Sequence, residues 1–128
     1  MSGPAHSGLF LYAKDLARVA GFYETVAQLS RLHANHELVV LQGQGIQLVV
    51  HAVPAPIAET IVLTSPPQRR DNTALKFFLT VPSLADAGRR AHELGGEVFA
   101  EQWPGPGFVA RNAMDPEGNV FQLREASR

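Results

Sequence analysis

A small set of polar side chains interrupts strand-like apolar segments of the chain, and their chemistry suits the recognition of a small molecule. These polar residues are Gln47, His51, Lys76 and Gln122. Aromatic residues occur in segments of the same kind, at Phe10, Tyr12 and Phe78. An ammonium group beside amide groups would hold a carboxylate, phosphate or carbonyl oxygen, and the aromatic rings would stack on a flat apolar ligand.

Alternation along strands decides which side chains can line one pocket, because successive residues point to opposite faces of a sheet. One row is apolar and should face the helices: Leu9, Leu11 and Ala13; Ile46, Leu48 and Val50; Phe77, Leu79 and Val81; Phe121 and Leu123. The other, which we call the mixed row, contains Gly8, Phe10 and Tyr12; Gln47, Val49 and His51; Lys76, Phe78 and Thr80; Gln122 and Arg124. A solvated sheet face would also be polar. Three aromatic residues in the mixed row favour a small-molecule pocket instead.

The composition limits the classes of protein to consider. At 128 residues the chain is of single-domain size. Its 11 Lys and Arg against 12 Asp and Glu give a formal net charge of -1, which supplies no basic surface for nucleic acid. No apolar run approaches the roughly 20 residues of a membrane helix, so we expect a soluble, cytoplasmic protein. The chain has no cysteine, which leaves His, carboxylate or amide groups as metal ligands.

Hydrophobic periodicity predicts two copies of one strand-and-helix pattern. Helices are predicted from about residues 15 to 29 and 83 to 94, each beginning at a residue that can cap free N–H groups. Strands are predicted at residues 9–13, 30–35, 37–42 and 46–51, and again at 76–81, 97–100, 107–114 and 119–124. Aligning the two helix starts superimposes Phe10 on Phe78 and Leu11 on Leu79, which indicates an internal repeat.

Three segments of this pattern resemble the vicinal oxygen chelate superfamily, which includes glyoxalase I, bleomycin-resistance proteins and extradiol dioxygenases. They are residues 9–26 (LFLYAKDLARVAGFYETV), 75–98 (LKFFLTVPSLADAGRRAHELGGEV) and 115–125 (DPEGNVFQLRE). The last segment is the most specific, and together they span nearly the whole chain. The resemblance implies an α+β fold of two βαβββ modules that form a curved, cleft-bearing mixed sheet with helices on the convex face. It also implies a homodimer whose cleft lies between modules paired within one chain or between two chains.

We therefore expect residues 1–128 to form a single domain. Its parts are the first module, 8–51, a connection, 52–74, and the second module, 75–125. Trp103 is predicted in a Pro- and Gly-rich loop, where it would be a dimer contact, a pocket wall or a packing residue. Whether Asn112 and Met114 extend the pocket depends on a bulge near Gly105 or Gly107, which would shift their phase.

Metal-using members of the superfamily take four ligands from the mixed row, and the resemblance places these positions at Gly8, Gln47, Lys76 and Gln122. Glycine has no donor side chain, and an ammonium group is not a ligand. The two amide oxygens lack the negative charge that holds a divalent ion. An ammonium group roughly 5 Å from such an ion would cost about 6 kcal/mol at an effective dielectric of about 20. The sequence therefore predicts neither a metal nor another cofactor at this site.

The histidines offer weaker alternatives. His6 precedes the first strand and could approach the cleft mouth, whereas His33 and His36 should point to opposite sides of an exposed strand and turn. His51 is either a hydrogen-bonding group of the pocket or a surface residue at a strand end. His92, on the second helix, should be solvated.

The preferred hypothesis is a glyoxalase- or bleomycin-resistance-like binding protein that holds a small, partly aromatic or anionic molecule, for example to sequester a drug. Its ligand-binding residues would be Phe10, Tyr12, Gln47, His51, Lys76, Phe78, Trp103 and Gln122. The alternative is a lyase, isomerase or dioxygenase of the same superfamily, using Lys76 as base or Schiff-base nucleophile, or a metal held by His6 or His51 and a glutamine. A third reading is a structural dimer without a ligand. A salt bridge from Lys76 to Glu125 or Glu37 would remove that lysine from the site.

Overall fold

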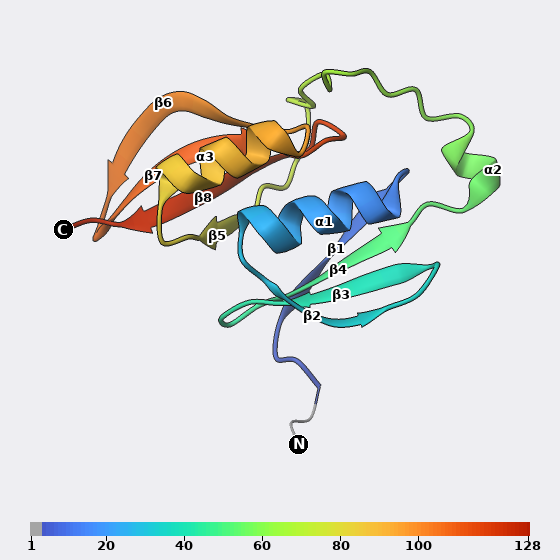
Figure 1. Ribbon diagram of the computed structural model, residues 1–128, viewed down its shortest axis with the longest axis horizontal. Coiled ribbons are helices and arrows are strands. Elements are labelled where there is room, and N and C mark those ends of the chain that lie inside the picture. Colours follow the sequence, from blue (N-terminus) through green and yellow to red (C-terminus); the bar gives the residue numbers. More distant parts are fainter. Residues whose placement is uncertain (1–3) are drawn as a thin grey trace.

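The two strand-and-helix patterns form two four-stranded sheets, each accompanied by a helix (Figure 1). The computed structural model describes residues 4–128. The first module consists of β1 (Gly8–Ala13), α1 (Leu16–Val26), β2 (Ser30–Ala34), β3 (Leu38–Gln42) and β4 (Gln47–Ala52). The second consists of β5 (Phe78–Thr80), α3 (Leu84–Glu93), β6 (Glu97–Gly105), β7 (Phe108–Met114) and β8 (Val120–Ala126). A short helix, α2 (Ala55–Ala58), lies in the connection.

Both sheets have the same topology, which confirms the predicted α+β fold of two βαβββ modules. The strand orders are β1-β4-β3-β2 and β5-β8-β7-β6. In each sheet the first strand pairs in parallel with the last strand of its module, and the other neighbours are antiparallel. The strands β1 and β5 therefore lie at sheet edges. Each module has an open sheet of its own.

Local capping explains where the two long helices begin. The Asp15 carboxylate accepts a hydrogen bond from the backbone N–H of Arg18 at 3.1 Å, and the Ser83 hydroxyl accepts one from Asp86 N–H at 3.1 Å. After α3 the chain turns at Gly95, whose φ of 90° suits glycine. Within the described residues, no helix is both long enough and apolar enough to cross a membrane.

The helix α1 joins the two modules through a buried aromatic core. Phe22 and Tyr23 of α1 lie against Phe121 of β8, with ring centroids 6.1 and 5.1 Å apart. Tyr23 also contacts Phe77, at 5.9 Å. Figure 1 shows α1 and α3 side by side, with the two sheets extending to either side of the helix pair. The row predicted to be apolar contributes to this core at Leu48, Val50, Leu79, Phe121 and Leu123, among others.

Glu117, in the turn between β7 and β8, clamps the second module to the start of α1. Its side chain is buried at 4% exposure. The carboxylate accepts the backbone N–H groups of Lys14 at 2.9 Å and Asp15 at 2.7 Å. Because these N–H groups precede the helix, they have no partner within it. The most specific stretch of the sequence, residues 115–125, therefore has a structural role in joining the modules.

Asp115 completes the same junction. Its carboxylate accepts hydrogen bonds from the Tyr23 hydroxyl at 2.8 Å and from the Asn119 amide at 2.9 Å. Burial raises the pKa of Asp115 above its ordinary value, and the hydrogen bonds from Asn119 and Tyr23 oppose that shift. Burial, with Asp115 nearby, raises the pKa of Tyr23 well above its ordinary value. Both groups are therefore held in an environment that disfavours their charged forms.

Two strands differ from the sequence prediction. β6 continues to Gly105, so Trp103 lies in a strand, and its placement in a loop was wrong. β6 is the outer strand of its sheet, where Pro104 can lack an N–H without breaking a ladder. The pairing irregularity lies in β6 between Val98 and Gln102, not near Gly105 or Gly107. β5 contains only Phe78–Thr80, because those three residues are the ones paired with β8.

Candidate functional site

The mixed row of the first sheet forms an exposed aromatic cluster. Phe10 and Tyr12 of β1 are 59% and 57% exposed. His51 of β4 pairs in register with Tyr12, and the two rings are 5.6 Å apart. Phe10 lies 6.5 Å from His51. Gly8 and Gln47 pair with each other at the beginning of the same two strands. The fold thus brings together Phe10, Tyr12 and His51, whereas Gln47 lies four residues away from His51 along β4 and donates a hydrogen bond to Gln42.

The ring of His51 is oriented by a backbone carbonyl. Its Nδ1 lies 2.8 Å from the carbonyl oxygen of Ala52. Because a carbonyl only accepts hydrogen bonds, Nδ1 carries the proton, and Nε2 of the neutral ring is then an acceptor. This arrangement suits the predicted hydrogen-bonding role of His51 in a pocket, which stays a prediction.

On the second sheet, Arg124 of β8 is held between two aromatic rings. The carbon Cζ of its guanidinium lies 3.5 Å from the ring centroid of Phe78 and 4.1 Å from that of Phe108. Its Nε donates a hydrogen bond to Oε1 of Gln122 at 2.8 Å. The sequence placed Arg124 in the mixed row but assigned it no role. The sequence could have indicated a role for Arg124, since it is two residues from Gln122 on a strand expected to line the site.

Register extends this face across β7 and β6. Trp103 pairs with Ala110, and Ala110 pairs with Arg124. Residues paired across neighbouring strands point to the same face, so Trp103 shares a face with Arg124. Asn112 likewise pairs with Gln122, so its side chain lies on the same face of the sheet as the mixed row. Trp103 is 39% exposed, and its role as a dimer contact, a pocket wall or a packing residue stays a prediction.

Lys76 lies just before β5 and is exposed. Its ammonium nitrogen is 3.3 Å from Oδ1 of Asn112. Within the described chain Lys76 forms no ion pair, and Glu125 instead accepts the backbone N–H of Leu84 at 2.6 Å. The partner of Gln122 in register is Phe78, not Lys76. Gln47 belongs to the first sheet and Gln122 to the second, so the predicted patch of one lysine between two glutamines would have to combine both sheets, and it stays a prediction.

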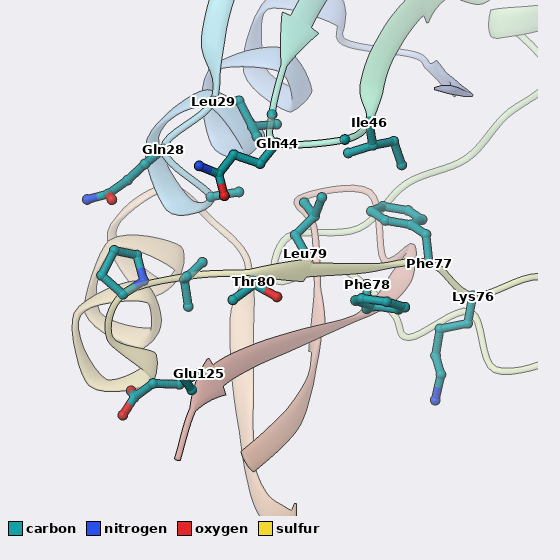
Figure 2. A pocket seen from close by; sticks show the side chains of 16 residues that line it. Gln28, Leu29, Gln44, Ile46, Lys76, Phe77, Phe78, Leu79, Thr80 and Glu125 are labelled. Atoms are coloured by element: carbon teal, nitrogen blue, oxygen red, sulfur yellow. The ribbon is translucent and has the colours of Figure 1, made fainter. Parts of the chain in front are cut away.

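A groove of about 1030 Å³ follows the free edge of β5 (Figure 2). Its walls include residues 27–29, which follow α1, the turn at residues 43–45 and β5. Of the predicted ligand-binding residues it includes Lys76 and Phe78, and Figure 2 shows the Lys76 ammonium group directed away from that turn. The groove shares Lys76, Phe78 and Thr80 with the mixed row and includes none of its residues on β1, β4 or β8. We place the candidate site on the mixed rows, because the stacked and hydrogen-bonding groups gather there.

The residues at the four family positions do not fit a metal ion. An added Cβ at Gly8 would lie 2.7 Å from the backbone oxygen of Gln47, so a ligand side chain has no room there without a shift. The oxygen of Gln122 already accepts a hydrogen bond from Arg124, and Lys76 presents a positive charge. Across residues 4–128, no group of three or more His, Cys, Asp or Glu side chains is arranged to hold a metal.

The remaining histidines lie on the surface. His33 of β2 and His36 in the turn that follows are exposed, as are His6 before β1 and His92 on α3. None of the four shares the mixed-row contacts of His51 with Phe10 and Tyr12.

Comparisons with known proteins agree with this architecture. Residues 8–124 match the family model described as a glyoxalase-like domain. A glyoxalase/bleomycin resistance protein/dioxygenase family enzyme from Burkholderia phytofirmans PsJN has a similar structure, with a TM-score of 0.70, 14% identity, and coverage of 94% of this chain and 98% of that chain. A hypothetical protein from S. aureus has a TM-score of 0.65 and 19% identity, with coverage of 97% of this chain and 96% of that chain. The fosfomycin resistance protein FosX from Listeria monocytogenes has a TM-score of 0.61 and 17% identity, with coverage of 99% of this chain and 95% of that chain.

At these identities the likeness to solved structures concerns the fold alone. No curated protein matches the chain.

Proposed function

Because the chain belongs to the glyoxalase-like domain family of the vicinal oxygen chelate superfamily, we propose that it binds a small, partly aromatic or anionic molecule between its two mixed rows. The supporting observation is that Phe10, Tyr12 and Phe78 are 59%, 57% and 50% exposed on these rows. Stacking a flat ligand on such rings removes apolar surface from water. Sequestering a drug or a related small molecule is a use that needs binding alone.

The proposal includes a homodimer. Within one chain the two mixed rows lie on separate sheets, whereas a small-molecule pocket surrounds most of its ligand. In the proposed dimer, the first sheet of one chain faces the second sheet of its partner. The edge positions of β1 and β5 support this arrangement, because an edge strand presents backbone groups that can pair with another chain.

The proposed binding uses no metal, because the donors at positions 8, 47, 76 and 122 do not suit one. The enzymatic alternative receives less support from the geometry. A lysine that serves as a base or Schiff-base nucleophile needs desolvation, whereas Lys76 is exposed and contacts the amide of Asn112. We therefore favour binding over catalysis; a cytoplasmic location stays a prediction.

Calorimetric titration with 2-naphthoate, a planar aromatic anion, tests the binding proposal. Phe10→Ala and Phe78→Ala should each weaken binding about tenfold, because truncating a stacked ring typically costs more than about 1 kcal/mol. Val62→Ala is the control, since Val62 is 87% exposed in the connection between modules. Equal affinity in all four proteins would contradict the proposal.

Mixing the two defective variants tests whether the cleft crosses chains. In a mixed dimer of Phe10→Ala and Phe78→Ala chains, one cleft would carry both substitutions and the other would carry neither. Co-refolding the variants should therefore restore high-affinity binding to part of the clefts. A mixture in which every site stays weak would place both rows of a cleft in the same chain.

A further inference from the structure

Arg124 lies in the mixed row of the second sheet, and its positive charge has no anionic partner among the described residues. The guanidinium carbon Cζ lies 3.5 Å from the ring centroid of Phe78 and 4.1 Å from that of Phe108. Only its Nε is engaged, by Gln122 at 2.8 Å. In the part of the chain that the structure describes, Arg124 forms no ion pair, and its terminal nitrogens have no hydrogen-bond partner.

Another stacked arginine in the chain shows the contrast. Arg69 lies 3.7 Å over the ring of Phe99, and its Nε is 3.8 Å from the carboxylate of Asp71. The carboxylate next to Arg124 in sequence, Glu125, is already used by the backbone N–H that begins α3. The charge of Arg124 is therefore left for a group from outside this chain.

The stacking determines which kind of group fits. Two rings lie against the guanidinium, and Gln122 accepts a hydrogen bond from its Nε, so the terminal nitrogens are the part that remains available. Arginine nitrogens form a planar fork that matches the two oxygens of a carboxylate. Because the rings and Gln122 already hold the side chain in one orientation, a ligand does not have to order it on binding.

Lys76 is less suited to orient an anion. Its ammonium group is exposed, sits on a flexible stem and contacts the neutral amide of Asn112 at 3.3 Å. An ammonium group acts as a point charge without a preferred plane. Position also favours Arg124, because it lies in the same cross-strand row as Trp103, two strands away. Two strand spacings are about 10 Å, a distance that a ligand with a carboxylate on a flat aromatic body can span.

We propose that Arg124 is the anion-recognition residue of the cleft and that it selects ligands carrying a carboxylate on a flat aromatic body. This inference rests on the proposed function, since it names the ligand class and the residue that recognises it. The rings of Phe78 and Phe108 and the hydrogen bond from Nε to Gln122 orient the Arg124 side chain.

The test compares 2-naphthoate with its neutral analogue 2-naphthamide by calorimetry on the full-length protein. The wild type should bind the carboxylate at least about tenfold more tightly than the amide. Arg124→Gln should bind the two compounds with equal affinity, and Arg124→Lys should recover only part of the preference, because it restores charge without the planar fork. Arg89→Gln, which removes an exposed arginine on α3, should keep the full preference.

A second readout separates recognition from folding. In the wild type, the Nε–H resonance of Arg124 should move saturably as 2-naphthoate is added and should not move with chloride. Thermal unfolding of the three variants shows whether they are folded. If Arg124→Gln does not fold, the comparison of the two compounds is made with Arg124→Lys.

The outcomes distinguish this inference from the proposed function. If both compounds bind the wild type but the carboxylate has no advantage, the cleft binds ligands and the role of Arg124 is refuted. A carboxylate preference that survives Arg124→Gln, or one abolished by Lys76→Gln alone, refutes it equally. If neither compound binds the wild type, the proposed function fails and the inference fails with it.

Discussion

Replacing Glu117 tests whether a buried carboxylate holds the two modules together. Its two oxygens accept the backbone N–H groups of Lys14 at 2.9 Å and Asp15 at 2.7 Å, and the side chain is 4% exposed. In Glu117→Gln one oxygen becomes an NH2 group, which cannot accept a hydrogen bond. One backbone N–H is then left without a partner and faces another donor. Glu117→Ala would leave both N–H groups without this partner.

The geometry gives the expected size of the effect. Hydrogen bonds to charged groups contribute roughly 1.5–3 kcal/mol each, and a buried donor left unsatisfied costs a similar amount. We expect Glu117→Gln to lower the free energy of unfolding by about 2 kcal/mol, which changes the folding equilibrium about 30-fold. Glu117→Ala should lower it by about 4 kcal/mol, because it removes both bonds.

Urea denaturation followed by circular dichroism provides the measurement. All proteins are compared at one concentration, because the stability of a dimer depends on concentration. The control is Glu93→Gln, which replaces an exposed carboxylate on α3 and should change stability by less than about 0.5 kcal/mol. If Glu117→Gln is no less stable than this control, or if the alanine variant is no worse than the glutamine variant, the clamp does not stabilise the fold.

Two further predictions concern the buried acid and the metal. Burial raises the pKa of Asp115 above 3.8, so the folded state favours the protonated form of this side chain. The stability that the protonated form contributes is complete below about pH 4 and is lost as the pH rises through the pKa of the folded state. The free energy of unfolding of the wild type minus that of Asp115→Asn should therefore fall from about pH 4 toward neutral pH in urea titrations; a difference that rises with pH would contradict this. Elemental analysis of purified protein should find zinc, nickel, iron and manganese below one ion per chain, and excess metal should not raise Tm. One tightly held ion per chain would contradict the argument that positions 8, 47, 76 and 122 do not suit a metal ion.

Local regularities explain why much of the fold could be read from the sequence. Alternation separated the apolar row, now represented in the core by Leu79, Phe121 and Leu123, from the exposed Phe10 and Tyr12. The alternation depends only on backbone geometry within each strand. Helix starts at a capping residue are equally local, as are glycine turns. The internal repeat then related the two modules.

Contacts between distant segments could not be read in this way. The sequence alone did not show that Trp103 continues a strand, because this depends on β6 being an outer strand that tolerates Pro104. Nor did it show that Lys76 meets Asn112, a contact that depends on β8 pairing with both β5 and β7. The Arg124 stack depends on three segments that the chain brings together from β5, β7 and β8.

The amino-acid sequence by itself therefore determined the side-chain types available on each strand face, including glycine, glutamine, lysine and glutamine at positions 8, 47, 76 and 122. The tertiary structure decided which of these side chains meet, leaving the two mixed rows on separate sheets and placing Arg124 between two rings. The physical reason is that the direction of a side chain follows from its own strand, whereas its neighbours follow from strand pairing and helix packing over long separations in sequence.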